Sequence, residues 1–190
     1  MSTLSSTIKE LGFPKAFPVQ DQSFAAIQDK KDLIIQAPPG SGKTLSYLIP
    51  LALRLTTNPD KRCLIIAPSP ELAMQIQKVC QELPEKLKIS NSTFVGAGNI
   101  KRQRDKLKNN NDQIIIGTPG RILEFLDRKL LKITDFAQIV LDEADYILTD
   151  GLRQDLFKHF DKLEEKQQLI LASATHGPES QEYIDNYMTD

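Results

Sequence analysis

The stretch "DLIIQAPPGSGKT", residues 32–44, decides the fold. It opens with an apolar run at 32–37, continues through a glycine-rich loop, and leads into a helical pattern at 43–56. A short apolar run that ends in proline and glycine predicts a buried strand, here one that turns directly into a helix. The same alternation of strand and helix recurs along the rest of the chain.

The loop "APPGSGKT" (37–44) is typical of a phosphate-binding loop. Gly40 and Gly42 would let the backbone turn its N–H groups inward, and the helix that starts near Gly42 adds its positive end. Lys43 would reach the β- and γ-phosphates of a nucleotide, and the Thr44 hydroxyl would bind Mg²⁺. The expected nucleotide-binding residues here are Ala37, Pro38, Pro39, Gly40, Ser41, Gly42, Lys43 and Thr44. A glycine-rich turn with an incidental lysine is not favoured, because strand, loop and helix are all in place.

Ala37 stands where such loops commonly begin with glycine. The substitution fits if the φ angle of this residue stays negative, since alanine is strained only at positive φ. Pro38 and Pro39 donate no N–H group but stiffen the entry to the loop. We therefore expect the loop to hold a nucleotide despite these changes.

Five further apolar runs predict strands, and helical patterns separate them. The predicted strands cover 63–68, 92–97, 113–118, 138–144 and 167–174, and the predicted helices cover 70–83, 99–109, 119–129 and 152–163. Pro18, Pro119 and Pro178 suit the first turns of helices. Apolar strands that alternate with helices favour a parallel sheet covered on both faces. The predicted fold class is therefore α/β, a doubly wound, mostly parallel sheet with helices on both faces.

Composition and charge exclude several classes of protein. The chain has 190 residues and 40% apolar content, which is enough for one well-cored domain. No apolar run reaches the roughly 18 residues of a membrane span, so no membrane partner is expected. Cys63 and Cys80 lack the spacing of a disulfide framework or a zinc site, which favours a cytoplasmic protein. The net charge is −1, so any nucleic-acid site must be local.

The segment "IVLDEAD" (139–145) ends a predicted strand with two adjacent carboxylates. Asp142 is placed to hold Mg²⁺ through water, and Glu143 is placed to orient and polarise an attacking water molecule. Together with Lys43, these two residues are the expected catalytic groups, and Thr44 and Asp142 are the expected Mg²⁺ ligands. The alternative is a charged loop after a strand, which the phosphate-binding loop upstream makes less favourable.

In their order along the chain, these motifs resemble the first of the two RecA-like domains of DEAD-box ATP-dependent RNA helicases. The matching segments are "GFPKAFPVQ" (12–20) for the adenine-reading Q motif, "APPGSGKT" (37–44), "PSPELA" (68–73), "VGAGNIKRQ" (95–103), "TPGR" (118–121), "DEAD" (142–145) and "SAT" (173–175). The resemblance covers nearly the whole chain. It implies one RecA-like ATP-binding domain over 1–190, with the Q-motif segment at 1–30 and with ATP and Mg²⁺ as ligands.

The resemblance also assigns residues to adenine recognition and to coupling. Gln20 would bond the edge of adenine and Phe13 would stack on its ring; a side-chain amide carries both donor and acceptor, so it can tell adenine from guanine. Taken alone, Gln20 is better explained as a polar residue at a helix start. Ser173 and Thr175 would bond Asp145 and link nucleotide state to domain closure; the alternative is a pair of hydroxyls at a strand end.

A groove for RNA is implied at the remaining motifs. Its residues would be Pro68, Ser69, Gly96, Thr118, Gly120 and Arg121. They would grip phosphates and 2′-hydroxyls of a single strand or short duplex, so binding would be largely independent of sequence. Pro70 replaces an arginine of the family's motif and Ala97 replaces a glycine. Both changes predict a weaker grip on RNA.

The leading hypothesis is the ATP-binding half of an RNA helicase that remodels or locally unwinds RNA duplexes and couples ATP hydrolysis to RNA binding. No segment like the "HRIGR" of the family's second domain occurs in these 190 residues. We expect that second RecA-like domain in a longer parent protein, and slow turnover by this chain alone. One alternative is a stand-alone nucleotide- or RNA-binding module without helicase activity. Another is a DNA-directed helicase or a different phosphate-loop ATPase, which the "GF…Q" spacing and "DEAD" disfavour.

Overall fold

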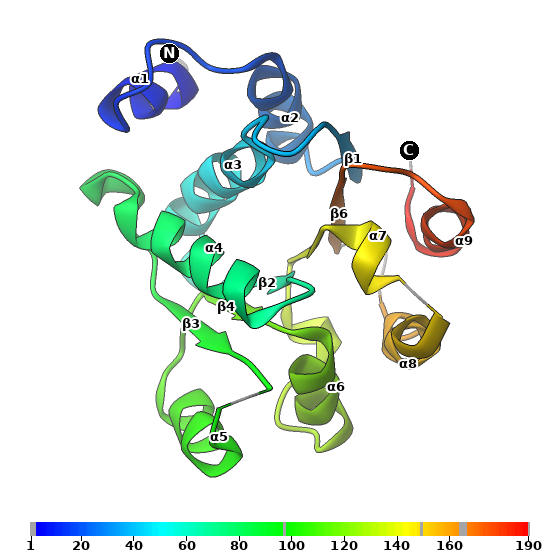
Figure 1. Ribbon diagram of the computed structural model, residues 1–190. Helices are drawn as coiled ribbons and strands as arrows, with labels where there is room; N and C mark the ends of the chain where they lie inside the picture. Colours follow the sequence, from blue (N-terminus) through cyan, green and yellow to red (C-terminus); the bar gives the residue numbers. More distant parts are fainter. Residues whose placement is uncertain (1–2, 97, 149, 164–166, 190) are drawn as a thin grey trace.

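The computed structural model describes residues 3–96, 98–148, 150–163 and 167–189 of the chain (Figure 1). Within these residues, six strands form one parallel sheet in the order β1-β6-β5-β2-β4-β3. The strands are β1 (Leu33–Gln36), β2 (Cys63–Ile66), β3 (Asn91–Phe94), β4 (Ile114–Gly117), β5 (Gln138–Asp142) and β6 (Gln168–Ser173). The predicted α/β class and parallel sheet are confirmed, and each predicted strand corresponds to an observed one.

Helices follow most strands, as the sequence predicted. They are α1 (Thr3–Glu10), α2 (Pro18–Gln28), α3 (Lys43–Thr57), α4 (Pro70–Glu82), α5 (Ile100–Asn109), α6 (Pro119–Asp127), α7 (Ala144–Ile147), α8 (Asp150–Phe160) and α9 (Pro178–Tyr187), with short 3₁₀ turns η1 (Glu85–Leu87) and η2 (Ile133–Asp135). Helices α2, α6 and α9 begin at prolines, where the missing N–H costs the helix nothing. Helix α1 and the single turn α7 were not anticipated.

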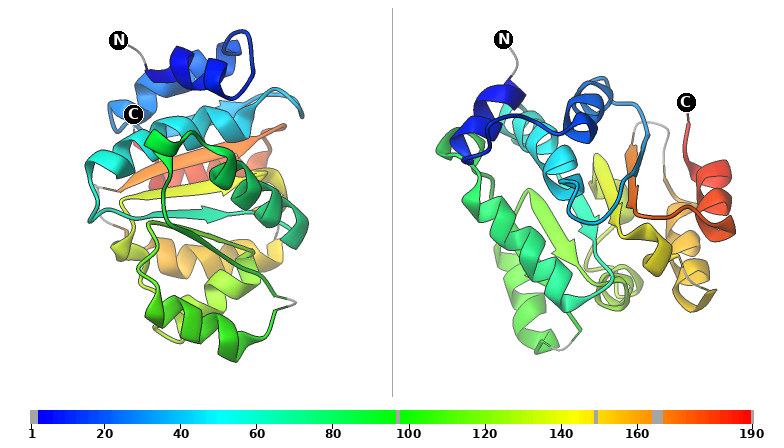
Figure 2. Two further views of the ribbon diagram at one scale, coloured as in Figure 1. Left: turned by 90° about the vertical axis from the view of Figure 1, so that its left-hand side faces the viewer. Right: turned by 45° about the horizontal axis from the view of Figure 1, so that its top comes forward.

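The sheet separates two apolar cores, and alternate strand residues face one or the other. Cys63 and Ile65 of β2 join the core under α1 to α4, whereas Leu64 and Ile66 join the core under α5 to α9. All four residues are fully buried, as expected of a parallel strand covered on both faces. Figure 2 shows the sheet lying between these two groups of helices.

Because all strands are parallel, their carboxyl ends lie at one edge of the sheet. The strand order divides this edge into two halves. Strands β1, β6 and β5 are neighbours and are followed by the segments 37–44, 173–175 and 142–145. Strands β2, β4 and β3 are neighbours and are followed by 68–73, 118–121 and 95–103. The topology therefore gathers the motifs into two groups of three.

None of the helices in the described ranges is long and apolar enough to cross a lipid bilayer.

Candidate functional site

The loop after β1 has the backbone geometry that its glycines predict. Gly40 and Gly42 have φ angles of 77° and 85°, in the left-handed region that favours glycine. At Gly42 a Cβ atom would also lie 2.6 Å from the Nε2 atom of Gln20, so a side chain there would be strained by its positive φ and would displace the Gln20 amide. Ala37 is not among the residues with positive φ, which is the condition for alanine at this position.

Lys43 and the first turn of α3 concentrate positive charge at this loop. The Lys43 Nζ atom donates to the carbonyls of Ala37 (2.6 Å) and Pro38 (3.2 Å), so the ammonium folds back over its own loop. The first bond inside α3 runs from the Ser46 N–H to the Gly42 carbonyl (3.0 Å), which leaves the preceding N–H groups of the first turn without a partner in the helix. This combination favours a bound anion.

The carboxylate of Asp142 lies at the end of β5 and is held on both oxygens. Its Oδ2 accepts from the Tyr47 hydroxyl (2.7 Å) and its Oδ1 accepts from the Glu143 backbone N–H (3.1 Å). Asp142 is 2% exposed, and this burial raises the pKa of its carboxyl, an effect that the Tyr47 hydrogen bond opposes. Burial, and then the nearby Asp142, raise the pKa of the Tyr47 phenol well above its ordinary value.

Glu143 follows directly and adopts a left-handed conformation, with φ 53° and ψ 54°. This conformation is uncommon for a residue other than glycine, and it turns the chain from β5 into α7 within one residue. The side chain of Glu143 is half-buried. Glu143 and Asp142 therefore both lie at the carboxyl edge of the sheet, at the end of β5.

Asp145 is bonded as predicted by only one of its two expected partners. The Thr175 hydroxyl donates to Asp145 Oδ2 (2.6 Å). The expected bond from Ser173 is absent: among the described residues, Ser173 Oγ and Asp145 Oδ1 are both buried without a hydrogen-bond partner. Ser173 is the last residue of β6 and is fixed there by pairing with β1, whereas Thr175 lies two residues further along, in the loop that reaches α7. The bond between Ser173 and Asp145 is therefore not formed in this structure, and the coupling role of Ser173 stays a prediction.

Gln20 links the Q-motif segment to the phosphate-binding loop. Its Oε1 accepts from the Phe17 N–H (2.9 Å), and its Nε2 donates to the Gly42 carbonyl at 3.5 Å, the limit for such a bond. Gln20 is 2% exposed. The helix-start role of Gln20 is therefore confirmed, and the same amide lies against the loop.

Two phenylalanines of this segment are about half exposed. Phe13, the expected stacking residue, is 45% exposed, and Phe17 is 47% exposed. Phe17 is the one that the structure places against the loop, with its Cδ2 3.2 Å from where a Cβ on Gly42 would lie. Sequence reasoning missed Phe17, although its position three residues before Gln20 at a helix start was a usable signal.

At the half of the carboxyl edge that follows β2, β4 and β3, several predicted RNA-binding residues lie at the N-termini of helices. Ser69 caps α4 by accepting from the Leu72 N–H (3.2 Å), and Pro70 takes the first helical position, as predicted. Thr118 precedes α6 and is 8% exposed. Gly96 and Gly120 are exposed, and Pro68 is half-buried. Ala97 lies outside the described residues.

Arg121, which is predicted to contact RNA, has its guanidinium turned inward in this structure, and its contact with RNA stays a prediction. It is 6% exposed, and its Nη2 donates to the carbonyls of Gly96 (2.9 Å) and Gly98 (3.2 Å). Its Nε lies 3.5 Å from Glu124. The guanidinium lies inward because it donates to backbone carbonyls of the loop between β3 and α5, four and two residues before α5 begins at Ile100. Arg121 therefore holds that loop.

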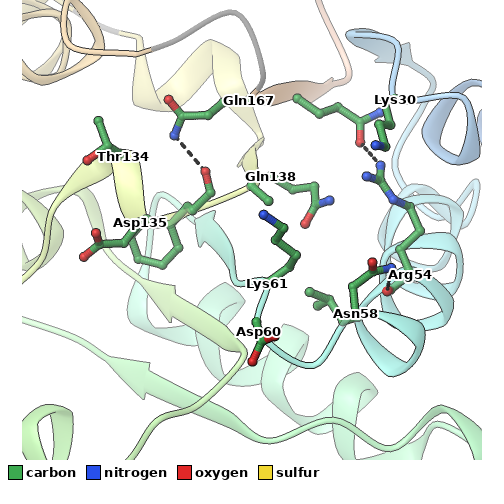
Figure 3. Close-up of a pocket in the computed structure, with 13 residues that line it drawn as sticks. Lys30, Arg54, Asn58, Asp60, Lys61, Thr134, Asp135, Gln138 and Gln167 are labelled. Carbon is green, nitrogen blue, oxygen red and sulfur yellow. Dashed lines mark hydrogen bonds between the residues drawn. The ribbon is translucent and has the colours of Figure 1, made fainter.

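A pocket of about 290 Å³ lies at the opposite edge of the sheet, by the amino ends of β5 and β6 (Figure 3). None of the predicted site residues lines it. Arg54 donates to Gln168 Oε1 (2.7 Å) and to the Ile27 carbonyl (2.9 Å), and Gln167 donates to the carbonyls of Ile133 and Phe136. The side chains of Arg54, Gln167 and Gln168 are thus bonded to neighbouring groups of the protein, which gives this part of the pocket the character of a structural cluster.

Comparison with known proteins agrees with the motif order. A family profile described as DEAD/DEAH box helicase matches residues 17–183. The chain belongs to the DEAD/DEAH box helicase family. It is 36% identical over 176 residues to "Probable ATP-dependent RNA helicase YfmL" of Bacillus subtilis, covering 91% of this chain and 46% of that protein. It is 33% identical to "ATP-dependent RNA helicase FAL1" of Candida glabrata, covering 96% and 47%.

Solved structures of DEAD-box proteins share the fold. The crystal structure of a DEAD box protein from Methanococcus jannaschii matches with a TM-score of 0.89 and 30% identity, covering 100% of this chain and 52% of that one. The chain thus spans about half the length of the curated relatives it matches. The six-stranded domain described here corresponds to that half.

Proposed function

We propose that this chain is the ATP-binding domain of an ATP-dependent RNA helicase, and that the nucleotide binds at the β1, β6 and β5 half of the carboxyl edge. One observation carries the proposal: the strand order makes these three strands neighbours, so the loop 37–44 and the acidic segment 142–145 lie at one place. The family membership supports the same conclusion, because its curated relatives are named as ATP-dependent RNA helicases.

The phosphates would take over bonds that the loop now makes with itself. Lys43 would exchange the carbonyls of Ala37 and Pro38 for phosphate oxygens, which form stronger, charge-assisted bonds. The backbone N–H groups of Gly40 to Thr44 and the Ser41 hydroxyl, which has no partner among the described residues, would supply the remaining contacts. The first turn of α3 adds its positive end.

Adenine recognition would fall to Gln20 and Phe13. An amide oxygen has two lone pairs and an amide nitrogen has two hydrogens. After bonding Phe17 and Gly42, Gln20 therefore retains one lone pair on Oε1 and one hydrogen on Nε2. These free positions match the donor and acceptor on the edge of adenine. Phe13 is exposed enough to stack on the ring.

Mg²⁺ fits the residues at this site. Thr44 and Asp142 offer only oxygen ligands, and each oxygen of Asp142 keeps a lone pair beyond its present bond. Within the described ranges no group of three or more His, Cys, Asp or Glu forms a metal cluster, which agrees with an ion held mainly by phosphates and water. When bound, Mg²⁺ neutralises charge on the phosphates. Glu143 would orient and polarise the attacking water.

RNA would bind along the β2, β4 and β3 half of the edge, through Pro68, Ser69, Gly96, Thr118 and Gly120. Backbone groups and small side chains there suit contacts to phosphate and sugar, so binding would be independent of sequence. Asp145 and Thr175 would couple the two halves.

Hydrolysis by this chain alone would be slow, since an arginine from a second RecA-like domain is typically worth about 10³–10⁵ in rate. Two free, buried thiols support a reducing, cytoplasmic location.

Calorimetry with ADP and GDP in the presence of Mg²⁺ tests the proposal. ADP should bind more tightly than GDP, and Gln20→Ala should reduce this preference. Gln22→Ala, an exposed position on the same helix, should leave the preference unchanged. Equal affinity of the wild-type chain for ADP and GDP would contradict adenine recognition, and no binding of either would contradict the nucleotide site.

A further inference from the structure

Tyr47 is buried in α3, and its hydroxyl is bonded to the first carboxylate of the DEAD segment. The side chain has no solvent exposure, and the O–H donates to Asp142 Oδ2 at 2.7 Å, across 95 residues of sequence. We propose that Tyr47 is a positioning residue of the nucleotide site, which fixes the Asp142 carboxylate toward the metal ion that accompanies the nucleotide. This inference rests on the proposed function.

The place of Tyr47 in the helix supports the proposal. Tyr47 follows Lys43 by four residues, so the two side chains stem from one face of α3 on successive turns. The helix that presents Lys43 and Thr44 to the phosphates therefore also presents the donor to Asp142. A shift of α3 relative to β5 would break this bond, so the bond ties the phosphate-binding element to the acidic one.

The bond also fixes the rotation of the carboxylate. Tyr47 holds Oδ2 from α3, and the Glu143 N–H holds Oδ1 from the chain that follows β5. Rotating the carboxylate about its side chain would lose one of these donors, and an unpaired buried oxygen is costly. Groups that orient a metal-ligating carboxylate in this way are typically needed for full metal affinity.

The chain offers a matched control for this hydroxyl. Tyr183 of α9 is 1% exposed, and its hydroxyl is buried without a hydrogen-bond partner among the described residues. Tyr47→Phe and Tyr183→Phe therefore remove the same atom from equally buried rings. Only the first removes a bond to Asp142.

The test measures ADP affinity by calorimetry in millimolar Mg²⁺ and in EDTA, for the wild-type chain and both variants. The gain in affinity that Mg²⁺ brings should fall in Tyr47→Phe by about 10-fold or more, the usual size of such orienting effects. Affinity in EDTA should stay within about 2-fold of wild type, because the phosphate contacts of Lys43 are intact. Tyr183→Phe should keep the full Mg²⁺ gain.

A full Mg²⁺ gain in a folded Tyr47→Phe chain, with only a lower Tm, would show that the bond is merely structural and would overturn the inference. If the wild-type chain binds no ADP, or binds it equally with and without Mg²⁺, the result would instead contradict the proposed function itself. If Tyr47→Phe does not fold, fluorine NMR on the wild-type chain labelled with 3-fluorotyrosine tests the inference instead. The Tyr47 resonance, assigned by eliminating the other three tyrosines, should move when Mg²⁺ joins bound ADP; a stationary resonance overturns the inference.

Discussion

The carboxyl and amino edges of the sheet differ in whether their buried polar side chains have hydrogen-bond partners. At the carboxyl edge, buried side-chain atoms lack hydrogen-bond partners among the described residues: Ser41 Oγ, Asp145 Oδ1, Ser173 Oγ and Arg121 Nη1. At the amino edge, the side chains of Arg54, Gln167 and Gln168 all bond to neighbouring groups (Figure 3). Gln138 Oε1 is the exception at that edge.

This difference fits the proposed function, in which the carboxyl edge binds the ligand and the amino edge contributes to stability. Leaving a buried polar group unpaired costs about 1–3 kcal/mol. Several such groups at one edge, together with the left-handed Glu143, indicate bonds that a ligand or a conformational change completes. The saturated amino edge instead ties α2 and α3 to the start of β6, through Arg54 and Gln168. Substitutions at the carboxyl edge should therefore lower ADP affinity and leave stability unchanged, whereas substitutions at the amino edge should lower stability and leave ADP affinity unchanged.

The largest effect is expected from Lys43→Ala at the carboxyl edge. Losing charge-assisted bonds to phosphate should lower ADP affinity by roughly 100-fold or more. Stability should change little, since Lys43 now bonds only loop carbonyls. Calorimetry and urea unfolding measure both quantities. Lys78→Ala, at an exposed position on α4, serves as the control and should affect neither. Full ADP affinity in Lys43→Ala would place the phosphates elsewhere.

Arg54→Ala at the amino edge should show the reverse signature. It leaves Gln168 Oε1 without its donor, whereas the Ile27 carbonyl still accepts from the Lys30 N–H and from Gln168 Nε2, so the free energy of unfolding should fall by about 1–3 kcal/mol. ADP affinity should stay within about 2-fold, because the variant is remote from the loop 37–44. Urea unfolding and calorimetry measure the two effects, with the exposed Arg102→Ala as control. A large loss of ADP affinity in folded Arg54→Ala would break the distinction between the edges.

Ser173→Ala should be tolerated or slightly stabilising, unlike most changes of a buried polar residue. Its hydroxyl is buried without a partner, so its removal should raise the free energy of unfolding by up to about 1 kcal/mol. Ser92→Ala is the matched change, since the buried Ser92 hydroxyl bonds Asp112, and it should cost about 1–3 kcal/mol. Thermal unfolding compares the two. Equal losses would mean that the Ser173 hydroxyl is bonded in solution.

The smallest effect is expected from thiol reagents, which probe the core between β2, where Cys63 lies, and α4, where Cys80 lies. Burial raises the pKa of Cys80 to about 12 and raises that of Cys63 further. The reactive thiolate is therefore scarce at any pH below that range, and both thiols are buried. The native chain should react slowly with Ellman's reagent near pH 8, and the urea-unfolded chain should react at both cysteines. Rapid reaction of the native chain would show that the core shared by β2 and α4 opens readily.

Much of this arrangement could be predicted from the sequence, because its signals are local. The near-continuous apolar runs gave all six strands, and "GSGKT" and "DEAD" gave the ends of β1 and β5. Helix α7 was missed because one turn leaves no periodic signal. Tyr47 was missed because its partner Asp142 is 95 residues away. The inward position of Arg121 could not be predicted, because the carbonyls that it contacts, those of Gly96 and Gly98, lie 25 and 23 residues away in the sequence.

Backbone amide NMR on the labelled chain, titrated with ADP and Mg²⁺, tests the contrast between the two edges most directly. The largest chemical-shift changes should fall in 37–44, 142–145 and 173–175, where the carboxyl edge leaves groups to be completed. Residues 54–61, 134–138 and 167–168, which line the saturated pocket at the amino edge, should change little. Changes concentrated at the amino edge, with the loop 37–44 undisturbed, would contradict the account.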